Sequence, residues 1–417
     1  MPNPIPLPSL AKASWLTRPE TQAVLAALKA AGHEGRIVGG AVRNALLGRP
    51  VADIDIATPA TPEQVMRAAA AAGLHVIPTG LQHGTVTVVN HHVPHEVTTL
   101  RRDVDTDGRH ATVAFTQDWA ADAARRDFTI NALTCDAAGT VHDPLGGYPD
   151  LVARRVRFIG SADQRIAEDY LRILRFFRFH AEYAAGPPDA EGLAACVRGL
   201  HGLARLSAER VRGELLKLIL APRALEVLEA MHAHGLLLPV LGTQPRLADL
   251  SRLIAIEKTL AIAAEPIRHL GCLALHAEED VAGLGTRLRL SNDACAVLET
   301  LVSPAAKSLP VALGIAAAKP LLYRMGAQAW RDAVLVQWAW SGASPGDAGW
   351  RQLATLPERW PVPVFPVKGG DLLALGVLPG PRVGALLRQL EEQWIAGGFE
   401  DGRDRLLALA RDLIGPD

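Results

Sequence analysis

Two aspartates separated by one residue are the part of this sequence with the clearest potential for chemistry. Asp53 and Asp55 alternate with Ile54 and Ile56, and side chains alternate between the two faces of a β-strand. We therefore expect both carboxylates on one face of a strand and both isoleucines in the core. Carboxylate oxygens are ligands that Mg²⁺ prefers, so Asp53 and Asp55 are predicted to be catalytic metal ligands. Taken alone, such a pair also fits the solvated end of a strand.

A glycine pair upstream of the aspartates could hold a phosphate. Gly39 and Gly40 follow the apolar stretch 36–38 and precede a predicted helix that carries Arg43. Glycines let a backbone approach a phosphate closely, N–H groups at a helix start point toward anions, and an arginine adds charge. These residues are therefore predicted to bind nucleotide phosphates, although a purely structural Gly-Gly turn fits them as well. A phosphate site beside a metal-binding pair is what phosphoryl-transfer chemistry requires.

Polar residues from later in the chain could complete this site. Glu96 lies in a predicted strand and could be a third catalytic acid, with an ordinary surface glutamate as the alternative. In the segment RRDFTINA (125–132), Arg126 could bind phosphates, while Asp127 and Asn131 could contact ribose hydroxyls. The alternative for this segment is a salt-bridged helix start.

A basic amphipathic segment follows further along the chain. Arg172, Arg175 and Arg178 are spaced by three residues, so they share one face of the helix predicted over 163–183. Asp169 joins the same stripe. A basic amphipathic helix without a ligand is the alternative interpretation.

Within this segment an acid and a base could together recognise a nucleobase. An aspartate accepts a hydrogen bond and an arginine donates one. Asp169 and Arg172 therefore match cytosine and adenine, which both present an exocyclic amine beside an unprotonated ring nitrogen, and they mismatch uracil and guanine. Glu168 lies four residues before Arg172 and could hold its guanidinium in place.

The composition is that of a folded protein with several domains. Of 417 residues, 49% are hydrophobic and 21% charged, and the length predicts two to four domains. The net charge of −1 gives no hint of a nucleic-acid partner, although a basic face can exist on a neutral protein. No apolar stretch of about 18 residues is present, and the first residues do not resemble a signal peptide. We expect a cytoplasmic protein with no membrane contact, and nothing in the sequence predicts a protein partner.

The order of elements predicts an α/β domain followed by helices. The strand patterns RIVGG, VADIDIAT, HGTVTVVN, HEVTTL and ALTCDAAGTVHD fall between about residues 35 and 144 and alternate with helical stretches. The turn cluster DPLGGYPD (143–150) could mark the edge of this domain. The remainder is rich in Leu and Ala, which favours helices.

Together these motifs resemble the class II tRNA nucleotidyltransferases and bacterial poly(A) polymerases of the DNA polymerase β-like superfamily. The resemblance covers about residues 36–220 and depends on GGAVRNALLG, DIDIAT, HGTVTV, HEVTTLRRDVDTDGRHATV, RRDFTINAL, DPLGG and EDYLRILRFFRF in the order of the family. The segment LSAERV (206–211) is similar to the helix-stabilising motif of the family's neck, so Arg210 is predicted to support the site. One departure is Asn44, where the family pattern G-G-x-V-R-D has an aspartate; an asparagine can still form hydrogen bonds.

The resemblance implies a chain of five parts. These are an N-terminal extension (1–34), an α/β nucleotidyltransferase head (35–148), a helical neck with base recognition (149–222), a helical body (223–345) and a helical, tRNA-binding tail (346–417). By position in the family, Arg175 and Arg178 support the nucleotide. Residues 101–113 match a flexible loop needed for adding the terminal A.

The implied activity is template-independent addition of CCA to the 3′ end of tRNA, with CTP and ATP as substrates, Mg²⁺ as cofactor and tRNA as partner. The nearest alternatives are a poly(A) polymerase and an enzyme that adds only A or only CC. The segment GLQHGTV (80–86) resembles the CCA-adding form, and the complete loop at 101–113 argues against a CC-only enzyme. An RNA-binding module without catalysis is disfavoured by the intact pair of Asp53 and Asp55.

Overall fold

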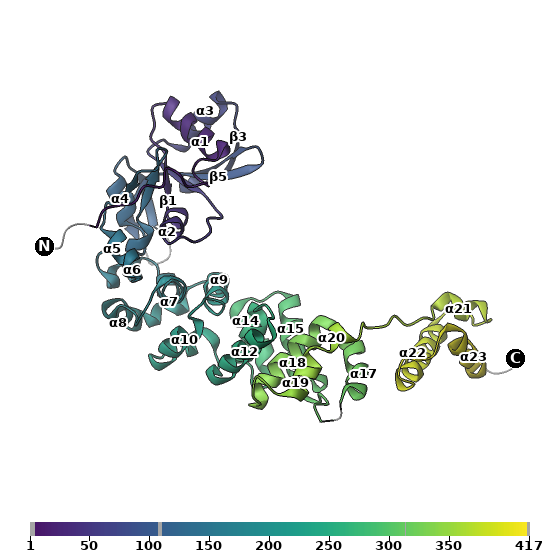
Figure 1. The fold of residues 1–417 in the computed structure, drawn as a ribbon. Helices are drawn as coiled ribbons and strands as arrows, with labels where there is room; N and C mark the ends of the chain where they lie inside the picture. The colour runs from purple at the N-terminus through teal and green to yellow at the C-terminus, as the bar shows by residue number, and fades with distance from the viewer. Residues whose placement is uncertain (1–4, 107–110, 313, 415–417) are drawn as a thin grey trace. The chain divides into compact units, whose positions relative to one another are not determined.

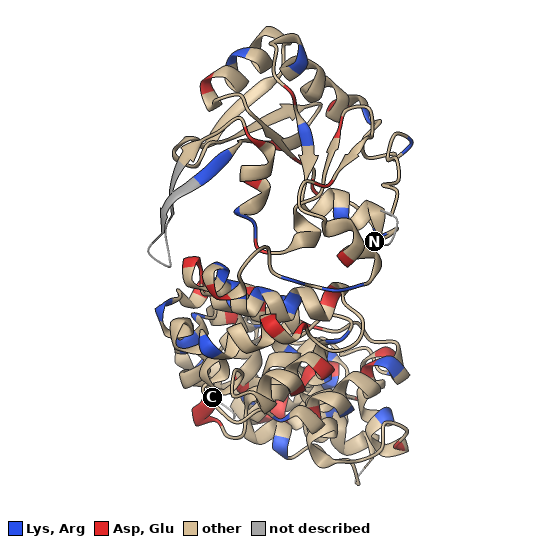
Figure 2. Ribbon diagram, turned by 90° about the vertical axis from the view of Figure 1, so that its left-hand side faces the viewer, with Lys and Arg blue, Asp and Glu red and all other residues tan. Residues whose placement is uncertain are grey.

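The chain forms two compact units, which we describe separately. The computed structural model describes residues 5–106, 111–312 and 314–414. Its internal contacts divide it into Met1–Val240 and Leu241–Asp417 (Figure 1). Basic and acidic residues are interspersed over both units (Figure 2), which fits the net charge of −1. The finer division into five parts stays a prediction.

A mixed β-sheet is the centre of the first unit. The strands of the described residues are β1 (Arg36–Val38), β2 (Asp55–Thr58), β3 (His75–Gly80), β4 (Thr85–Asn90), β5 (Val93–Thr99), β6 (Arg101–Thr106), β7 (Ala111–Phe115), β8 (Thr134–Asp136) and β9 (Val141–His142). Seven of them form one sheet in the order β3-β4-β5-β2-β1-β8-β9, while β6 and β7 pair separately. The pairing of β2 with β5 is parallel and the other pairings are antiparallel.

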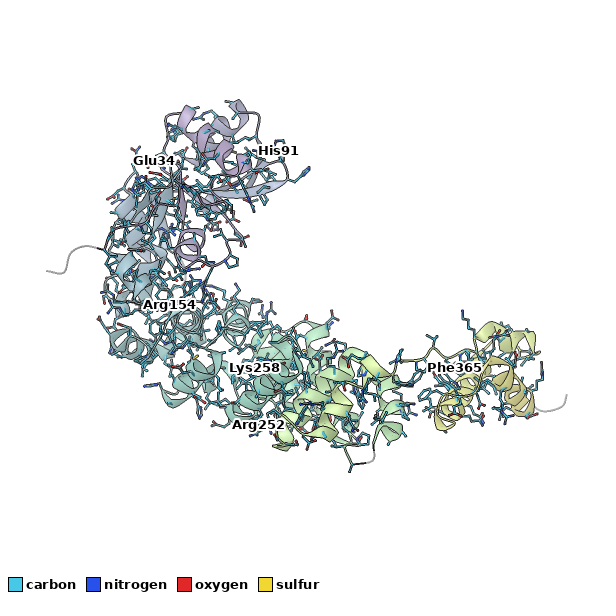
Figure 3. All side chains as sticks on the ribbon, viewed as in Figure 1. Glu34, His91, Arg154, Arg252, Lys258 and Phe365 are labelled. Atoms are coloured by element: carbon cyan, nitrogen blue, oxygen red, sulfur yellow. The ribbon has the colours of Figure 1, made fainter. Side chains whose placement is uncertain are left out.

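The register of the sheet follows from its apolar pattern and from one tight turn. Val86, Val88 and Val97 are fully buried, and β-branched side chains suit a pleated, packed surface. The turn between β4 and β5 has two central residues at positive φ, His91 (44°) and His92 (66°), and Figure 3 labels the first of them. Because a two-residue turn fixes the register of its hairpin, it determines which residues of β5 lie opposite β4.

Helices surround the sheet and continue beyond it. Those of the first unit are α1 (Pro19–Ala30), α2 (Gly40–Leu46), α3 (Pro62–Ala71), α4 (Trp119–Ala124), α5 (Gly147–Val152), α6 (Ala162–Glu168), α7 (Leu171–Tyr183), α8 (Ala190–Arg198), α9 (Ala208–Leu218) and α10 (Ala224–Ala233), with 3₁₀ turns η1 (Leu81–His83), η2 (Thr129–Asn131) and η3 (Leu200–Arg205). Helices α1 and α3 pack on each other and on β4 and β5 (Figure 1). Helix α3 begins at a capping box, in which Thr61 and Gln64 satisfy each other's backbone N–H groups.

An aromatic cluster attaches α7 to the rest of the first unit. Phe128 lies 5.1 Å from Phe179 and 5.0 Å from Phe158, measured between ring centroids, and Phe158 stacks on Phe176 at 5.3 Å. Phe128 and Phe158 also form a backbone bridge. Tilted and offset aromatic contacts stabilise a core beyond the area they bury, so the face of α7 that carries arginines is held in a fixed orientation.

The second unit is built from helices in its described part. After the four-residue helix α11 (Leu238–Leu241) they are α12 (Leu247–Leu260), α13 (Pro266–Ala274), α14 (Glu279–Leu288), α15 (Asn292–Val302), α16 (Pro304–Lys307), α17 (Ile315–Met325), α18 (Ala327–Ser341), α19 (Ala348–Ala354), α20 (Leu356–Arg359), α21 (Gly369–Ala374), α22 (Pro381–Ala396) and α23 (Arg403–Ile414). Trp330 and Trp338 of α18 are fully buried. None of the helices described in the chain is both long and apolar enough to cross a membrane.

The structure corrects three local expectations. Strand β2 begins at Asp55, so Asp53 precedes the strand instead of lying within it. The helix expected over 163–183 is two helices, because Asp169 between them has an extended backbone (φ −156°, ψ 105°) and its carboxylate accepts the N–H of Leu171. Much of the predicted loop 101–113 forms the hairpin of β6 and β7, and residues 107–110 lie outside the described part.

The second unit contains a buried charged network. Arg268 is 2% exposed and donates to Glu257 Oε1 at 2.8 Å, to Asp332 Oδ1 at 2.6 Å and to the carbonyl of Ala263 at 2.6 Å. His269 Nε2 lies 2.7 Å from Glu257 Oε2. Removing one partner of a buried ion pair leaves the other charge without compensation, so the network requires Arg268.

We predict that Arg268→Ala lowers the free energy of unfolding of the second unit by roughly 3–5 kcal/mol, because two buried carboxylates lose the cation they share. Denaturant titration of the full chain, followed by tryptophan fluorescence, would show the transition at lower denaturant. Arg324→Ala is the matched control, since its pair with Glu392 is exposed and should contribute about 0–1 kcal/mol. Equal midpoints for the two variants would contradict the prediction.

Candidate active site

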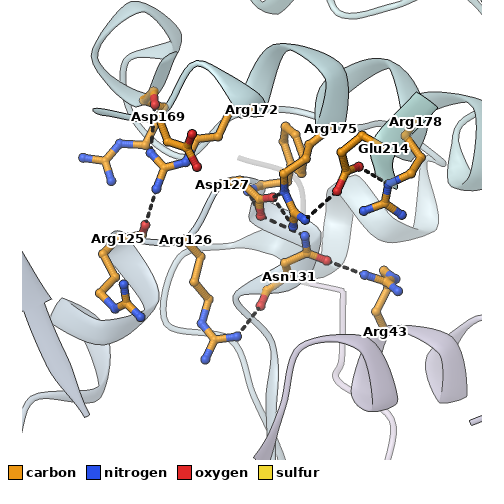
Figure 4. Close-up of polar contacts among 12 residues, drawn as sticks. Arg43, Arg125, Arg126, Asp127, Asn131, Asp169, Arg172, Arg175, Arg178 and Glu214 are labelled. Atoms are coloured by element: carbon orange, nitrogen blue, oxygen red, sulfur yellow. Dashed lines mark hydrogen bonds and ion pairs between the residues drawn. The ribbon is translucent and has the colours of Figure 1, made fainter. Parts of the chain in front are cut away.

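One cavity of the first unit collects most of the predicted site residues. Its volume is about 570 Å³. Twelve of the predicted residues line it: Gly39, Gly40, Arg43, Asp55, Glu96, Arg126, Asp127, Asn131, Asp169, Arg172, Arg175 and Arg178. Three predicted residues, Asp53, Glu168 and Arg210, are not among the lining residues. Figure 4 shows the polar contacts of this region.

Carboxylates gather where β2 and β5 run side by side. The parallel register places Asp55 opposite Glu96, and Ile54 and Ile56 are buried as expected. The pKa of Asp55 is raised, first by burial and then by the charges of Glu96 and Asp53. Within the described residues, none of these three carboxylates has a hydrogen-bond or ion-pair partner. The mutual repulsion that raises the pKa of Asp55 would be relieved by a bound cation.

Gly39 brings the backbone close to an arginine of the cavity. It has φ +64° and ψ −118°, a conformation that residues other than glycine rarely adopt. A Cβ atom there would lie 3.3 Å from Arg126 Nη1. Arg126 is held by Asp122 Oδ2 at 3.3 Å and by the carbonyl of Asn131 at 3.3 Å. The glycine therefore leaves room for a guanidinium beside the start of α2.

Arg43 is buried and held from three sides. Its Nη1 donates to Asn131 Oδ1 at 2.5 Å and its Nη2 donates to the Tyr183 hydroxyl at 2.7 Å. Asn44 Oδ1 accepts from Nε at 3.2 Å and from Nη2 at 3.1 Å. Burial lowers the pKa of Arg43, yet a guanidinium remains charged at neutral pH. The expectation that Asn44 can still form hydrogen bonds is confirmed.

Asp127 and Glu214 hold the arginines of α7. Asp127 Oδ2 binds Arg175 at 2.6 Å, and Asp127 Oδ1 accepts from Asn131 Nδ2 at 2.9 Å (Figure 4). Glu214 of α9 lies 3.5 Å from Arg175 and also pairs with Arg178. Burial by itself would raise the pKa of Asp127, but the charge of Arg175 and these hydrogen bonds lower it. Asp127 is therefore ionised at neutral pH and anchors Arg175.

The predicted base-reading pair is anchored and retains bonding capacity. Arg172 donates to Glu168 Oε2 at 2.6 Å and to the carbonyls of Arg165 and Arg125 at 2.9 Å each. A guanidinium has five N–H donors, so two of them remain after these three bonds. Asp169 accepts from Arg210 Nη2 at 2.7 Å. The supporting positions predicted for Glu168 and Arg210 match these contacts, while recognition of a base stays a prediction.

Several residues that line the cavity or hold its arginines escaped the sequence analysis. Asp122 pairs with Arg125 and Arg126 at helical spacings of three and four, a signal that was present in the sequence. Glu214 lies 36 and 39 residues from its partners, and such long-range pairing leaves no local pattern. Phe179 also lines the cavity, and its apolar type suggested only a core position.

Comparison with known proteins agrees with this geometry. A family model described as "Poly A polymerase head domain" matches residues 35–157, and "Probable RNA and SrmB- binding site of polymerase A" matches residues 189–250. "CCA tRNA nucleotidyltransferase 1, mitochondrial" of Mus musculus is 37% identical over 391 residues, which cover 90% of this chain and 86% of that one. The chain belongs to the CCA tRNA nucleotidyltransferase family.

Further relatives cover nearly the whole chain. The "CCA-adding enzyme" of Geobacillus stearothermophilus is 33% identical over 93% of this chain and 95% of its own length. A crystal structure of the Bacillus stearothermophilus CCA-adding enzyme in complex with CTP has a TM-score of 0.72 and 29% identity, covering 95% of this chain and 98% of that chain. The predicted fold class, an α/β head of the DNA polymerase β type followed by helical parts, is confirmed.

We predict that Gly39→Ala lowers kcat/KM for nucleotide incorporation by about tenfold or more, because a Cβ at this backbone conformation presses on Arg126 and misplaces it. Gly48→Ala is a matched control, since Gly48 has nearly the same φ (+67°) with no atom within 4 Å of its Cβ position. Steady-state kinetics and thermal unfolding of both variants separate the two effects. If both variants lose stability but neither loses activity, the role assigned to Gly39 is wrong.

Proposed function

We propose that this chain builds the CCA end of tRNA without a nucleic-acid template, using CTP and ATP in one active site. The observation that carries this proposal is that one cavity contains carboxylates, several arginines and the pair of Asp169 and Arg172. The relatives support it, since they are named CCA-adding enzymes and one of them has been solved in complex with CTP.

The carboxylates fit a divalent cation, which we propose to be Mg²⁺. Asp55 and Glu96 lie opposite each other on neighbouring strands, and the charge of Glu96 contributes to the raised pKa of Asp55. No preformed group of three His, Cys, Asp or Glu side chains occurs within the described residues, and Mg²⁺ typically uses one or two protein carboxylates together with water and phosphate oxygens. Asp53 and Asp55 would hold the ion, with Glu96 as a third acid. A bound Mg²⁺ supplies charge neutralisation and favours deprotonation of the attacking hydroxyl.

The remaining residues bind and orient the substrates. In the proposed reaction the 3′-hydroxyl oxygen of tRNA forms a bond to the α-phosphorus of the nucleotide, and the bond from that phosphorus to the leaving pyrophosphate breaks. Arg43 and Arg126, with the backbone beside Gly39 and Gly40, hold the triphosphate in line for this displacement. Orientation of this kind supplies a large part of catalysis when reactants are held in a near-attack geometry.

The choice of nucleotide is assigned to Asp169, which lies between α6 and α7, and to Arg172 in the first turn of α7. Asp169 is fixed by Arg210 and Arg172 by Glu168, so both side chains present their remaining acceptor and donors in fixed directions. Cytosine and adenine offer an amine and an unprotonated nitrogen in the matching order. The side chains thereby act as the template, and Arg175 and Arg178 support the same nucleotide.

The tRNA is the proposed macromolecular partner, bound mostly through its phosphates and shape by the helical parts.

Ribose contacts of Asp127 and Asn131 remain a prediction, since the structure shows both side chains bonded to arginines. Cytoplasmic location remains a prediction as well, and the mouse relative is named mitochondrial.

Extension of a tRNA that lacks its CCA end tests the function. With CTP alone the product should grow by CC, and with CTP and ATP it should end in CCA, resolved to single nucleotides on a gel. Asp53→Ala and Asp55→Ala should abolish extension while tRNA binding is largely kept, because the cation site is lost. A long A tract, addition of A alone or arrest at CC would assign a sister activity, and substantial extension by either variant would refute the metal ligands.

We predict that Arg172→Ala weakens discrimination against UTP and GTP by about tenfold to a hundredfold, because a pair of directed hydrogen bonds to a base contributes roughly 1–3 kcal/mol of selectivity. Competition between CTP and UTP in single-turnover extension measures this ratio. Arg198→Ala is the control, since its pair with Asp163 is exposed. Unchanged selectivity in Arg172→Ala would rule out side chains as the template.

A further inference from the structure

The buried arginine of α2 differs in its partners from five of the other arginines that line the cavity. Arg125 and Arg126 pair with Asp122, Arg172 with Glu168, Arg175 with Asp127 and Glu214, and Arg178 with Glu214. Arg43 is bonded instead to the neutral side chains of Asn44, Asn131 and Tyr183. Within the described part of the chain, no carboxylate lies within ion-pair distance of Arg43.

The surroundings of Arg43 preserve its charge while fixing its direction. The rings of Tyr183 and Phe179 lie 4.1 Å and 5.1 Å from its guanidinium carbon. The acid whose charge acts on it is Asp127, and both oxygens of Asp127 are already bonded, to Arg175 and to Asn131. A buried cation whose partners are all neutral has a strong electrostatic preference for an anionic ligand.

Asn44 makes two bonds that a carboxylate at its position could not make together. Its Oδ1 accepts from Arg43, and its Nδ2 donates to the carbonyl of Pro50 at 3.3 Å. Pro50 belongs to the connection between α2 and Asp53. An aspartate, which the family pattern has at this position, would accept from Arg43 but would face the Pro50 carbonyl without a proton to donate.

We propose that Asn44 is a positioning residue that orients Arg43 without neutralising it, and that it thereby sets the affinity of the site for triphosphate and for pyrophosphate. This inference rests on the proposed function, because Arg43 is assigned there to the triphosphate. A carboxylate at position 44 would form an ion pair with Arg43, and the nucleotide would then compete with that pair for the guanidinium.

The inference has three measurable consequences. CTP and ATP share the triphosphate, so a substitution at position 44 should change the KM of each by the same factor. The inhibition constant of pyrophosphate, the product, should change in the same direction, because pyrophosphate presents the same anionic groups. Selectivity between bases should not change, since within the described residues Asp169 and Arg172 form no hydrogen bond or ion pair with Asn44.

The test compares Asn44→Asp with Asn44→Ala in the full chain, using a tRNA that lacks its CCA end. For Asn44→Asp we expect the KM of CTP, the KM of ATP and the inhibition constant of inorganic pyrophosphate to rise together by about tenfold, since a charged partner replaces a neutral one. Asn44→Ala removes the same bonds without adding charge and should raise the inhibition constant of pyrophosphate less. Selectivity against UTP and GTP should stay at the wild-type value in both variants.

Controls make each outcome decisive. Asn90→Asp adds the same charge at the end of β4, outside the residues that line the cavity, and should leave the constants unchanged. If thermal unfolding shows that Asn44→Asp does not fold, Asn44→Glu carries the same charge and should act in the same direction. Equal inhibition constants for the acidic and alanine variants would overturn the inference. A wild-type protein that does not extend tRNA would instead overturn the proposed function.

Discussion

Seven of the described arginines line one cavity of the first unit, and their mutual repulsion must be offset before that cavity can exist. Most of these arginines form ion pairs with acidic residues, namely Asp122, Glu168, Asp127 and Glu214. Each acid also fixes the direction of its arginine, because a guanidinium donates in a rigid planar fork. The ion pairs therefore stabilise the positive charge of the site and fix the directions in which its guanidinium groups donate, and binding a triphosphate requires both.

The same network joins three segments of the first unit that are distant in sequence. Asp127 and Asn131 come from the segment around η2, the arginines from α7, and Glu214 from α9, while Phe128 before η2 packs on Phe179 of α7. A change in one segment therefore alters the geometry of the others. Side chains held in this way can recognise a base by fixed donor and acceptor directions, because little ordering is left to occur on binding.

Sequence reasoning located the cavity residues well where the signal was local. The glycine pair, the two aspartates and the arginine stripe were identified by type and spacing. It was wrong about the path of the backbone at Asp169, because a side chain that caps the next helix interrupted the helical pattern. It also missed β3, which contains a proline, and β6, whose charged residues do not alternate as a half-buried strand should, together with β7, the partner of β6.

The sequence by itself determined the chemistry of this protein: two carboxylates one residue apart, a glycine pair before a helix, and an acid and arginines spaced along a helical stretch. These patterns depend on covalent spacing and on the period of the local backbone, so they can be read from the chain. Only the tertiary structure decided that Glu96 lies beside Asp55, that Glu214 holds the arginines of α7, and that Arg43 has neutral partners. Those facts depend on strand register and helix packing between distant segments, which no local pattern encodes.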